Sequence, residues 1–335
     1  FGLILDAHSL NDLMELAKEA EDAGFHSIWA TELYRTSFQQ LAAAASVTSK
    51  IKLGTAVALA FVRSPLITSI TCLDLDELSK GRLILGLGTG ARRTNENFHG
   101  IKFGDKPATR IRECIEIIKS IIKNSHTGNE IIVDSEFYKI NTKGYKRAFN
   151  PIRENIPVYL AGIGEKMIKN SAKSADGYLG HVVCSLKYIK EVVIPSINHG
   201  MEKRDKGDFK ICSIITCAVS DDVEKAREAA KGTIAFYATV RTYEPPFKLH
   251  GFTDQTRKIR EAYFNKDSRM MIDCVTDEMV DTFAVVGNET YCREKINEYK
   301  EFIDLPILSA PHYYLDFMEV RKYQKSLIKA FGRKK

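Results

Sequence analysis

The sequence contains no apolar run long enough to cross a membrane. A membrane helix needs roughly 18 to 20 consecutive apolar residues, and polar or charged residues interrupt every apolar stretch well before that length. No signal-peptide pattern is recognised either. We therefore expect a cytoplasmic protein with no membrane partner.

Cysteine and histidine are few and form no metal-binding pattern. The seven cysteines are irregularly spaced, include no Cys-x-x-Cys motif and have no histidines at zinc-ligand spacing. No two of the eight histidines stand at ligand spacing, and no Gly-x-Ser-x-Gly motif marks a serine nucleophile. We predict buried thiols in a reducing compartment and no metal site. An enzyme without these groups takes its reactivity from a bound organic cofactor.

Charge of one sign is not in large excess. Lysine and arginine number 49 against 43 aspartates and glutamates, which gives a net charge of +6, and the two signs are interspersed. This pattern does not favour nucleic-acid binding. The composition, with 44% hydrophobic and 27% charged residues, is that of a globular protein. A chain of 335 residues buries about three quarters of its extended surface on folding, so it needs no disulfide or metal for stability.

Short β-branched runs alternate with longer segments of helical spacing along the sequence. The predicted strands are residues 3–5, 27–30, 51–57, 83–87, 157–160, 178–179, 210–219 and 305–308. A helical pattern follows each of them. Eight strand–helix pairs favour an α/β fold with a single (β/α)8 TIM barrel over a doubly wound sheet.

Two stretches are longer than the usual connections between a strand and a helix. Residues 129–157 have the pattern of a β-hairpin, and residues 237–282 that of a loop with extra helices. We predict one domain, residues 1–335, in which these two segments are insertions. The second segment and its start bring Phe236, Tyr237, Tyr243 and Phe247 near Arg241, which favours a carbon-based, partly apolar substrate.

Glycine-rich turns follow two of the predicted strands. Gly88-Thr89-Gly90 ends the fourth strand, and Gly162-Ile163-Gly164 follows the fifth and opens a helix. Glycine allows a ligand to approach the backbone, and free amides at a helix start favour an anion such as phosphate. The plain alternative at each position is a tight turn. Two such turns on adjacent strands favour a ligand with a ring system and a phosphate.

Polar side chains follow other predicted strands at the same end of the barrel, where active sites of this fold lie. Asp6 and His8 follow the first strand, Glu32 the second and His181 the sixth. Glu32, His8 and His181 are our candidates for acid–base catalysis. The alternatives are that Asp6 caps a turn and that His181 is a structural histidine with satisfied hydrogen bonds.

Two arginines lie near the same end. Arg63 follows the third strand, and Arg92 follows the glycine turn of the fourth. Either one can face a cofactor or occupy a structural or solvated position, and Arg92 would suit an acidic cofactor tail.

Several blocks occur in an order that resembles the bacterial-luciferase-like family. They include Gly54-Thr55-Ala56-Val57, Arg63-Ser64-Pro65, Gly86-Leu87-Gly88-Thr89-Gly90, Tyr159-Leu160-Ala161-Gly162 and Ala175-Asp176-Gly177, together with residues 20–29 and 75–82. The ordered blocks cover most of residues 1–185, and a weaker match covers 287–308. Within the family, the sequence is most similar to the branch that uses the deazaflavin coenzyme F420, which includes methylenetetrahydromethanopterin reductases.

The resemblance implies a (β/α)8 barrel with a flavin-type ring across its mouth, and a homodimer. It implies a bulge behind the ring with a non-prolyl cis peptide at Ala56-Val57 or one residue later. It also implies that the two glycine turns supply amides to the cofactor and that Glu32 takes the acidic position near the ring. The cofactor-binding residues that we predict are Asp6, Ala56, Val57, Arg63, Gly88, Thr89, Gly90, Arg92, Gly162, Ile163 and Gly164.

The sequence departs from the sugar-phosphate dehydrogenases of that family at two positions. Those enzymes have an Asp-His pair where this chain has Glu32-Leu33, and a glutamate after the glycine turn where this chain has Ala91. We therefore do not expect that activity. The departures leave the proton donor open among the three catalytic candidates.

Three functions fit these observations. The first is a coenzyme F420-dependent oxidoreductase that transfers a hydride between the deazaflavin ring and a small organic substrate, such as a methylenetetrahydromethanopterin-like one-carbon carrier or an alcohol. The second is an FMN-dependent luciferase-like monooxygenase, which would need a partner flavin reductase. The third is a flavin-binding barrel without catalytic turnover.

Overall fold

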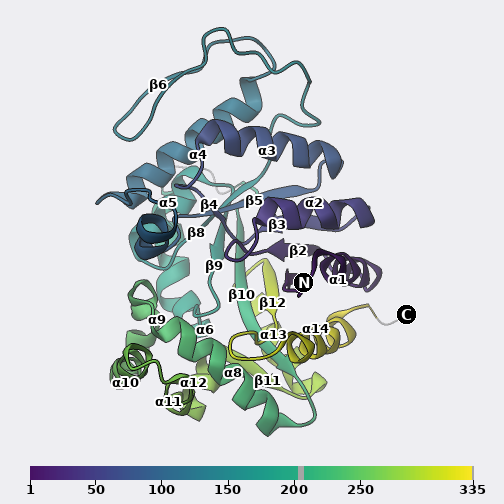
Figure 1. Ribbon diagram of the computed structural model, residues 1–335, viewed down its shortest axis with the longest axis vertical. Helices are drawn as coiled ribbons and strands as arrows, with labels where there is room; N and C mark the ends of the chain where they lie inside the picture. The colour runs from purple at the N-terminus through teal and green to yellow at the C-terminus, as the bar shows by residue number, and fades with distance from the viewer. Residues whose placement is uncertain (203–206, 334–335) are drawn as a thin grey trace.

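Eight parallel strands close into a barrel in the computed structural model, which describes residues 1–202 and 207–333 (Figure 1). β10 pairs with both β9 and β12, and this closes the ring. The predicted (β/α)8 fold is confirmed. Around the barrel the strands are β12 (Leu305–Ser309), β1 (Gly2–Leu5), β2 (Ser27–Ala30), β3 (Lys52–Thr55), β5 (Leu83–Gly88), β8 (Val158–Ala161), β9 (Gly177–Gly180) and β10 (Lys210–Val219).

Helices connect the strands and cover the outside of the barrel. The first begins at a capping box, in which Asp12 N donates to Ser9 Oγ at 3.1 Å and Ser9 N donates to Asp12 Oδ2 at 3.0 Å. The helices are α1 (Leu10–Asp22), α2 (Ser37–Val47), α3 (Pro65–Leu78), α4 (Pro107–Asn124), α5 (Glu165–Ser174), α6 (Leu186–Tyr188), η2 (Ile189–Val193), α7 (Ile194–Met201), α8 (Val223–Ala238), α13 (Glu289–Lys300) and α14 (Phe317–Phe331).

The predicted third strand is shorter than expected and ends in a bulge. β3 stops at Thr55, the Ala56–Val57 peptide bond is cis, and pairing resumes as β4 (Ala58–Leu59) beside β5. The cis bond is at the first of the two positions that the resemblance implied, so that expectation is confirmed. The strand β4 was not predicted, because a strand of two residues has no periodicity.

One further strand was missed. β11 (Ala284–Gly287) pairs in parallel with residues 216–219 at the end of β10, beyond the stretch of β10 that pairs with β9. Its four residues directly follow α12 (Asp277–Phe283), and an apolar run this short cannot be distinguished from the end of a helix.

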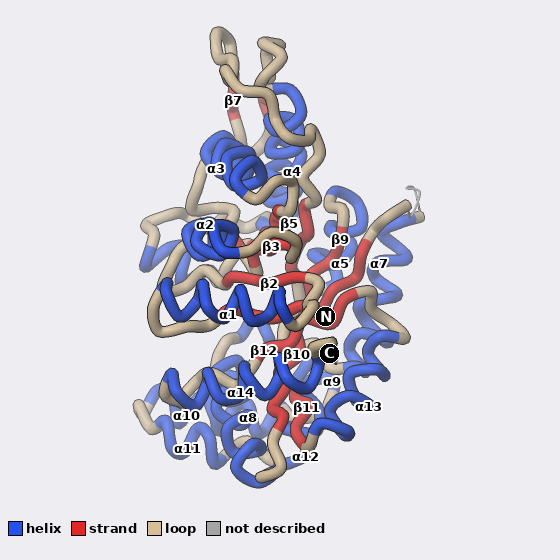
Figure 2. Tube along the Cα trace, turned by 90° about the vertical axis from the view of Figure 1, so that its right-hand side faces the viewer, coloured by secondary structure: helices blue, strands red, loops and turns tan. Residues whose placement is uncertain are grey.

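Two segments project from the barrel or cover its side. Residues 129–157 contain β6 (Ile132–Asp134) and β7 (Lys139–Asn141), an antiparallel pair at the top of Figure 2. Residues 237–282 contain η3 (Arg241–Tyr243), α9 (Glu244–Leu249), α10 (Thr253–Phe264), α11 (Ser268–Asp273) and most of α12. The helices α9 to α12 lie together beside the barrel, at the lower left of Figure 1. That both segments are insertions into one domain stays a prediction.

The single tryptophan fills the barrel core next to a glycine. Trp29 on β2 is fully buried, and a Cβ on the facing Gly54 of β3 would lie 2.2 Å from Trp29 Cε3. The indole Nε1 donates to Ser27 Oγ at 2.8 Å, so the buried ring has no unpaired donor. Gly54, which is part of a family block, is therefore required by core packing.

No helix in residues 1–202 and 207–333 combines the length and the apolarity that a membrane span requires. All seven cysteines are free. Six are buried, as expected, and Cys274 is half-buried.

Candidate active site

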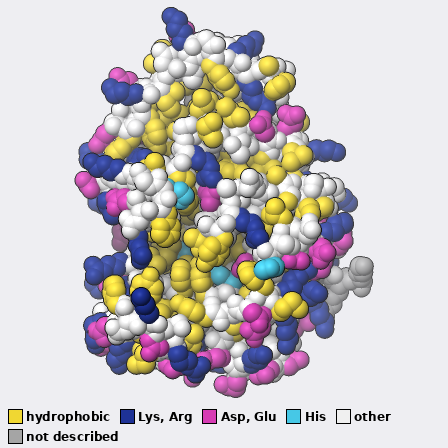
Figure 3. All heavy atoms as spheres, in the orientation of Figure 1, with side chains coloured by type: hydrophobic (Ala, Val, Ile, Leu, Met, Phe, Trp, Pro, Cys, Tyr) yellow, Lys and Arg dark blue, Asp and Glu magenta, His cyan; other side chains and the backbone are white. Residues whose placement is uncertain are grey.

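The barrel brings most of the predicted site residues to one mouth. Residues that follow β1, β2, β3, β5, β8 and β9 meet at the same end because these strands are parallel. They are Asp6, Glu32, Ala56, Val57, Gly88, Thr89, Gly90, Gly162, Ile163, Gly164 and His181. Figure 3 shows one face of the molecule, with hydrophobic side chains gathered at its centre and histidines among them.

Glu32 and Arg63 form a bidentate ion pair at this mouth. Arg63 Nη1 donates to Glu32 Oε2 at 2.8 Å, and Nη2 donates to Oε1. The backbone N–H of Leu59 in β4 also donates to Oε2, at 2.8 Å. The Glu32 side chain is only 8% exposed and that of Arg63 21%. Glu32 thus joins the end of β2 to β4 as an acceptor of hydrogen bonds, which favours a positioning role over the predicted role of proton donor.

The glycines of β5 allow close packing against the bulge. A Cβ on Gly86 would lie 1.9 Å from Thr55 O, and a Cβ on Gly88 would lie 2.6 Å from Val57 Cγ2. No side chain fits at either position. These two glycines are therefore required by strand packing, whatever contact they make with a ligand.

An asparagine that we did not predict as a site residue hydrogen-bonds to the turn after β5. Asn95, at the start of η1 (Thr94–Phe98), is fully buried, and its Nδ2 donates to Thr89 O at 2.8 Å and to Ala91 O at 3.0 Å. Its Oδ1 is buried without a hydrogen-bond partner in the described residues. Gly90 has a φ of +67°, a conformation that disfavours other residues.

The turn at residues 162–164 is oriented by two buried tyrosines. Tyr178 Oη donates to Gly162 O at 2.8 Å, and Tyr188 Oη donates to Ile163 O at 2.8 Å. These peptide bonds are trans, so the N–H groups of Ile163 and Gly164 point opposite to the two carbonyls and away from the tyrosines. Neither amide has an acceptor within residues 1–202 and 207–333. The turn therefore offers two free donors.

The same turn opens helix α5 and leaves space beside it. Gly164 is the N-cap of α5, and a Cβ at this position would meet nothing within 4 Å. At Gly162, by contrast, a Cβ would lie 2.3 Å from Met167 Cγ. The first amides of a helix have no intrahelical acceptor, and the helix dipole favours negative charge there. Geometry and electrostatics both suit an anion at this position.

His181 is held between two aromatic rings. It stacks on Tyr243 with ring centroids 4.2 Å apart and meets the edge of Tyr237 at 4.5 Å. Burial lowers the pKa of His181 to about 3, and the charge of the neighbouring His312 contributes to the shift. The imidazole is therefore neutral at physiological pH. Its Nδ1 is buried with no hydrogen-bond partner in the described part of the chain.

These rings belong to an aromatic wall whose residues come from four parts of the fold. Tyr313 stacks on Phe236 with centroids 3.7 Å apart, and it packs against His312 at 4.3 Å. The wall consists of His181 after β9, Phe236 and Tyr237 in α8, Tyr243 in η3, and His312 and Tyr313 after β12. His312 and Tyr313 were missed because no motif surrounds them.

Phe247 does not join the aromatic wall, although the sequence analysis placed it beside the substrate. It is 1% exposed and packs against Phe283 of α12, with ring centroids 4.6 Å apart. The prediction was wrong because an aromatic residue in an added helix carries no signal that separates a core position from a site position.

Two predicted residues lie in exposed positions. His8 is exposed and packs edge-on against Phe317, with centroids 4.8 Å apart. Arg92 is half exposed, lies 5.0 Å from the centre of the Phe103 ring and forms an ion pair of 3.1 Å with Glu96. Their catalytic and cofactor-binding roles stay predictions.

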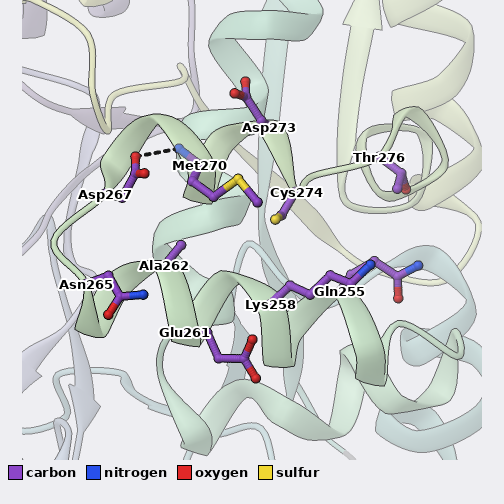
Figure 4. Close-up of a pocket in the computed structure, with 10 residues that line it drawn as sticks. All are labelled: Gln255, Lys258, Glu261, Ala262, Asn265, Asp267, Met270, Asp273, Cys274 and Thr276. Carbon is purple, nitrogen blue, oxygen red and sulfur yellow. Dashed lines mark hydrogen bonds between the residues drawn. The ribbon is translucent and has the colours of Figure 1, made fainter.

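A separate pocket of about 550 Å³ lies between α10 and α11 (Figure 4). Six of the ten residues that line it are exposed and polar, and Met270 N donates to Asp267 Oδ1 at 2.9 Å. None of the predicted site residues lines it. In the part of the chain that the structure describes, no three or more His, Cys, Asp or Glu residues are grouped so as to hold a metal ion.

Comparison with known proteins identifies the family. A family model described as luciferase-like monooxygenase matches residues 2–304. The chain belongs to this family. The resemblance drawn from the sequence blocks is confirmed, and so is the enzyme class, an oxidoreductase.

The luciferase-like chain also has individual relatives of similar length. It is 34% identical over 298 residues to the 5,10-methylenetetrahydromethanopterin reductase of Archaeoglobus fulgidus, a match that covers 86% of this chain and 85% of the relative. It is also 34% identical to an uncharacterized protein of Mycobacterium tuberculosis, covering 85% and 86%. The solved coenzyme F420-dependent tetrahydromethanopterin reductase of Methanopyrus kandleri has a similar fold, with a TM-score of 0.83, 26% identity and coverage of 98% and 97%.

Proposed function

We propose that the protein is a coenzyme F420-dependent oxidoreductase that transfers a hydride between the deazaflavin and a small organic substrate. The observation that carries this proposal is the turn at residues 162–164, whose free amides two buried tyrosines turn away from the core. The names of the reductases from Archaeoglobus fulgidus and Methanopyrus kandleri support deazaflavin as the cofactor.

The residues at the mouth fit such a cofactor. The amides of Ile163 and Gly164 and the start of α5 would bind its phosphate, in the open space beside Gly164. The bulge at Ala56 and Val57 would support one face of the ring. The turn at residues 88–90, held by Asn95, would border the ring, and Arg92 would meet the acidic tail.

The protein's part in catalysis is to position and enclose the reactants. When bound, the deazaflavin accepts or gives a hydride at one ring carbon. The aromatic wall would hold the substrate against the opposite face of the ring and exclude water, because its rings pack against one another. Holding the reacting atoms in contact and in the right orientation would supply a large part of the catalysis. Asp6 follows β1 at the same mouth, and the Glu32–Arg63 pair, with the Leu59 amide, joins the end of β2 to β4.

The substrate would be a one-carbon carrier of the methylenetetrahydromethanopterin type or an alcohol. The partly apolar wall supports a carbon-based substrate, and Ala91, in place of an acidic residue, argues against a sugar phosphate. We also propose that the enzyme is cytoplasmic and acts as a homodimer.

An FMN-dependent monooxygenase is the second candidate, and the description of the family model favours it. It would require a flavin reductase to supply reduced FMN, and oxygen as co-substrate. A barrel that binds the cofactor without turnover would show neither hydride transfer nor oxygen consumption.

Anaerobic single-turnover mixing tests the proposed function. The protein is mixed with oxidised F420 and a panel of alcohols, and with reduced F420 and methylenetetrahydromethanopterin, while the deazaflavin absorbance is followed. We expect absorbance to fall in the first series or to rise in the second, with one substrate class. No change with any substrate in either direction would contradict hydride transfer, and oxygen uptake with reduced FMN would favour the second candidate.

A further inference from the structure

We propose that His312, with the Asp6 carboxylate as its charge partner, is the residue that exchanges a proton with the substrate. This inference rests on the proposed function, since it assigns a residue to the proton that accompanies hydride transfer. The inference leaves the cofactor contacts described above unchanged. It concerns a histidine that lies in no recognisable sequence motif.

Asp6 supplies the first observation. It follows β1 and is half-buried, yet its carboxylate forms no hydrogen bond or ion pair within residues 1–202 and 207–333. Only its backbone carbonyl is engaged, as the acceptor of Gln324 Nε2 at 2.7 Å. A carboxylate withdrawn from water without a partner is costly. Its charge acts on three groups of the aromatic wall, namely His312, Tyr237 and Tyr313.

The orientation of His312 supplies the second observation. Its backbone N–H donates to Thr233 Oγ1 at 3.3 Å, and its Nδ1 lies 3.2 Å from Ala310 O. A carbonyl oxygen only accepts, so Nδ1 carries the hydrogen. In the neutral ring the lone pair is then on Nε2, and Nε2 has no hydrogen-bond partner in the described part of the chain. His312 is thus fixed in the tautomer that accepts a proton at Nε2.

Two histidines at this mouth have different environments. His181 is enclosed by Tyr237 and Tyr243, and no carboxylate of residues 1–202 and 207–333 acts on it. Burial also lowers the pKa of His312, but there the Asp6 charge and the Ala310 carbonyl oppose the shift. Within the described residues, a carboxylate charge therefore favours the imidazolium of His312, and none favours that of His181. This difference, together with the fixed tautomer of His312, favours His312 over His181 for the acid–base role.

Atoms and charge balance in both directions of the proposed reaction, oxidation and reduction of the substrate. During oxidation, the C–H bond of the reacting carbon breaks and its electron pair leaves as hydride to the oxidised deazaflavin. For an alcohol, the O–H proton goes to His312 Nε2, and the bond pair it leaves forms the C=O double bond. For a one-carbon carrier, the lone pair of the adjacent tertiary nitrogen forms the C=N bond, and His312 Nε2 takes the N–H proton of the second amine as that nitrogen bonds to the carbon. The imidazolium, stabilised by Asp6, then releases the proton to solvent. During reduction, the same Nε2–H donates the proton.

NMR titration of the cofactor-free protein tests the pairing without any substrate. The pKa of His312 is measured with labelled histidine in the wild type and in Asp6→Asn, and the His312→Gln variant assigns the signal. The titratable groups that act on or contact His312 are Asp6 after β1, His181 after β9 and the adjacent Tyr313. We expect Asp6→Asn to lower the pKa of His312, because it removes the negative charge. Asp134→Asn removes an exposed carboxylate that pairs with Lys139 and is the control for the loss of one negative charge. His199→Gln removes an exposed histidine that pairs with Glu202 and is the control for the signal assignment. An unchanged pKa in Asp6→Asn would overturn the proposal.

The loaded enzyme gives the second readout. His312→Gln is expected to bind F420 with wild-type affinity and to lose about 100-fold or more in turnover, with the pH dependence of the wild type removed. Wild-type turnover in His312→Gln would contradict the assignment. Absence of F420 binding in the wild type would overturn the proposed function instead, so the two failures are distinguishable.

Discussion

The Glu32–Arg63 pair gives the sharpest stability prediction. Glu32→Gln keeps the shape of the side chain and removes its charge, so the Arg63 guanidinium loses its ionic partner while it is only 21% exposed. Removal of one partner of a buried ion pair costs about 3–5 kcal/mol. The partial exposure of Arg63 reduces this figure, and the Gln carbonyl can still accept from Leu59 N. We therefore expect the free energy of unfolding to fall by about 2–3 kcal/mol.

Urea unfolding at pH 7.5 measures this change. The matched control is Glu116→Gln, whose i,i+4 pair with Arg112 spans 3.2 Å with side chains 54% and 39% exposed. It should lose less than about 0.5 kcal/mol. Adding Arg63→Met to Glu32→Gln should restore part of the lost stability, because no unpaired charge then remains. The reasoning would be refuted if Glu32→Gln were as stable as Glu116→Gln.

Three further predictions concern the mouth. Gly164→Ala should lose only about 0.5 kcal/mol of stability but bind the cofactor more weakly, since its Cβ enters open space at the phosphate position, whereas Gly162→Ala should lose about 1–3 kcal/mol because its Cβ meets Met167. Urea unfolding and a cofactor titration of both variants check this, and equal cofactor affinity in Gly164→Ala and wild type would remove the turn from the site. Tyr178→Phe leaves the Gly162 carbonyl without its donor, so it should lower the free energy of unfolding by about 1–2 kcal/mol and weaken phosphate binding, both measured by calorimetry. Unchanged stability and affinity would show that the hydroxyl does not orient the turn. Folding lowers the pKa of His181 from 6.5 to about 3, so the unfolded chain binds the proton first and stability is lost as the pH falls below about 6.5. His181→Gln should therefore remove about 2 kcal/mol of the stability difference between pH 8 and pH 5, measured by urea unfolding. An identical pH dependence in the variant and the wild type would contradict the burial of His181.

The barrel could be predicted from the sequence because its strands are buried on both faces. Such strands occur as short apolar runs between helices, and their order alone fixes a parallel barrel. The strands that escaped prediction, β4 and β11, have two and four residues and depend on the partners they pair with. Local patterns contain no information on such pairings.

The candidate site was only partly predictable for a related reason. Glycine turns are visible because their residue type is unusual at strand ends. The contacts of Glu32 were not, since Arg63 is 31 residues away in the sequence and only the folded barrel brings the two side chains together. His312 lies 306 positions from Asp6 by the numbering, and only closure of the barrel between β12 and β1 brings them together.

A matched binding titration tests the central claim most directly. The purified protein is titrated with F420 and, separately, with FMN at equal concentrations, and fluorescence and absorbance are followed, with Gly164→Ala as the variant of the proposed phosphate site. The account predicts tight binding of F420, weak binding of FMN and a loss of F420 affinity in Gly164→Ala. Tight binding of FMN alone, or of neither cofactor, would contradict it.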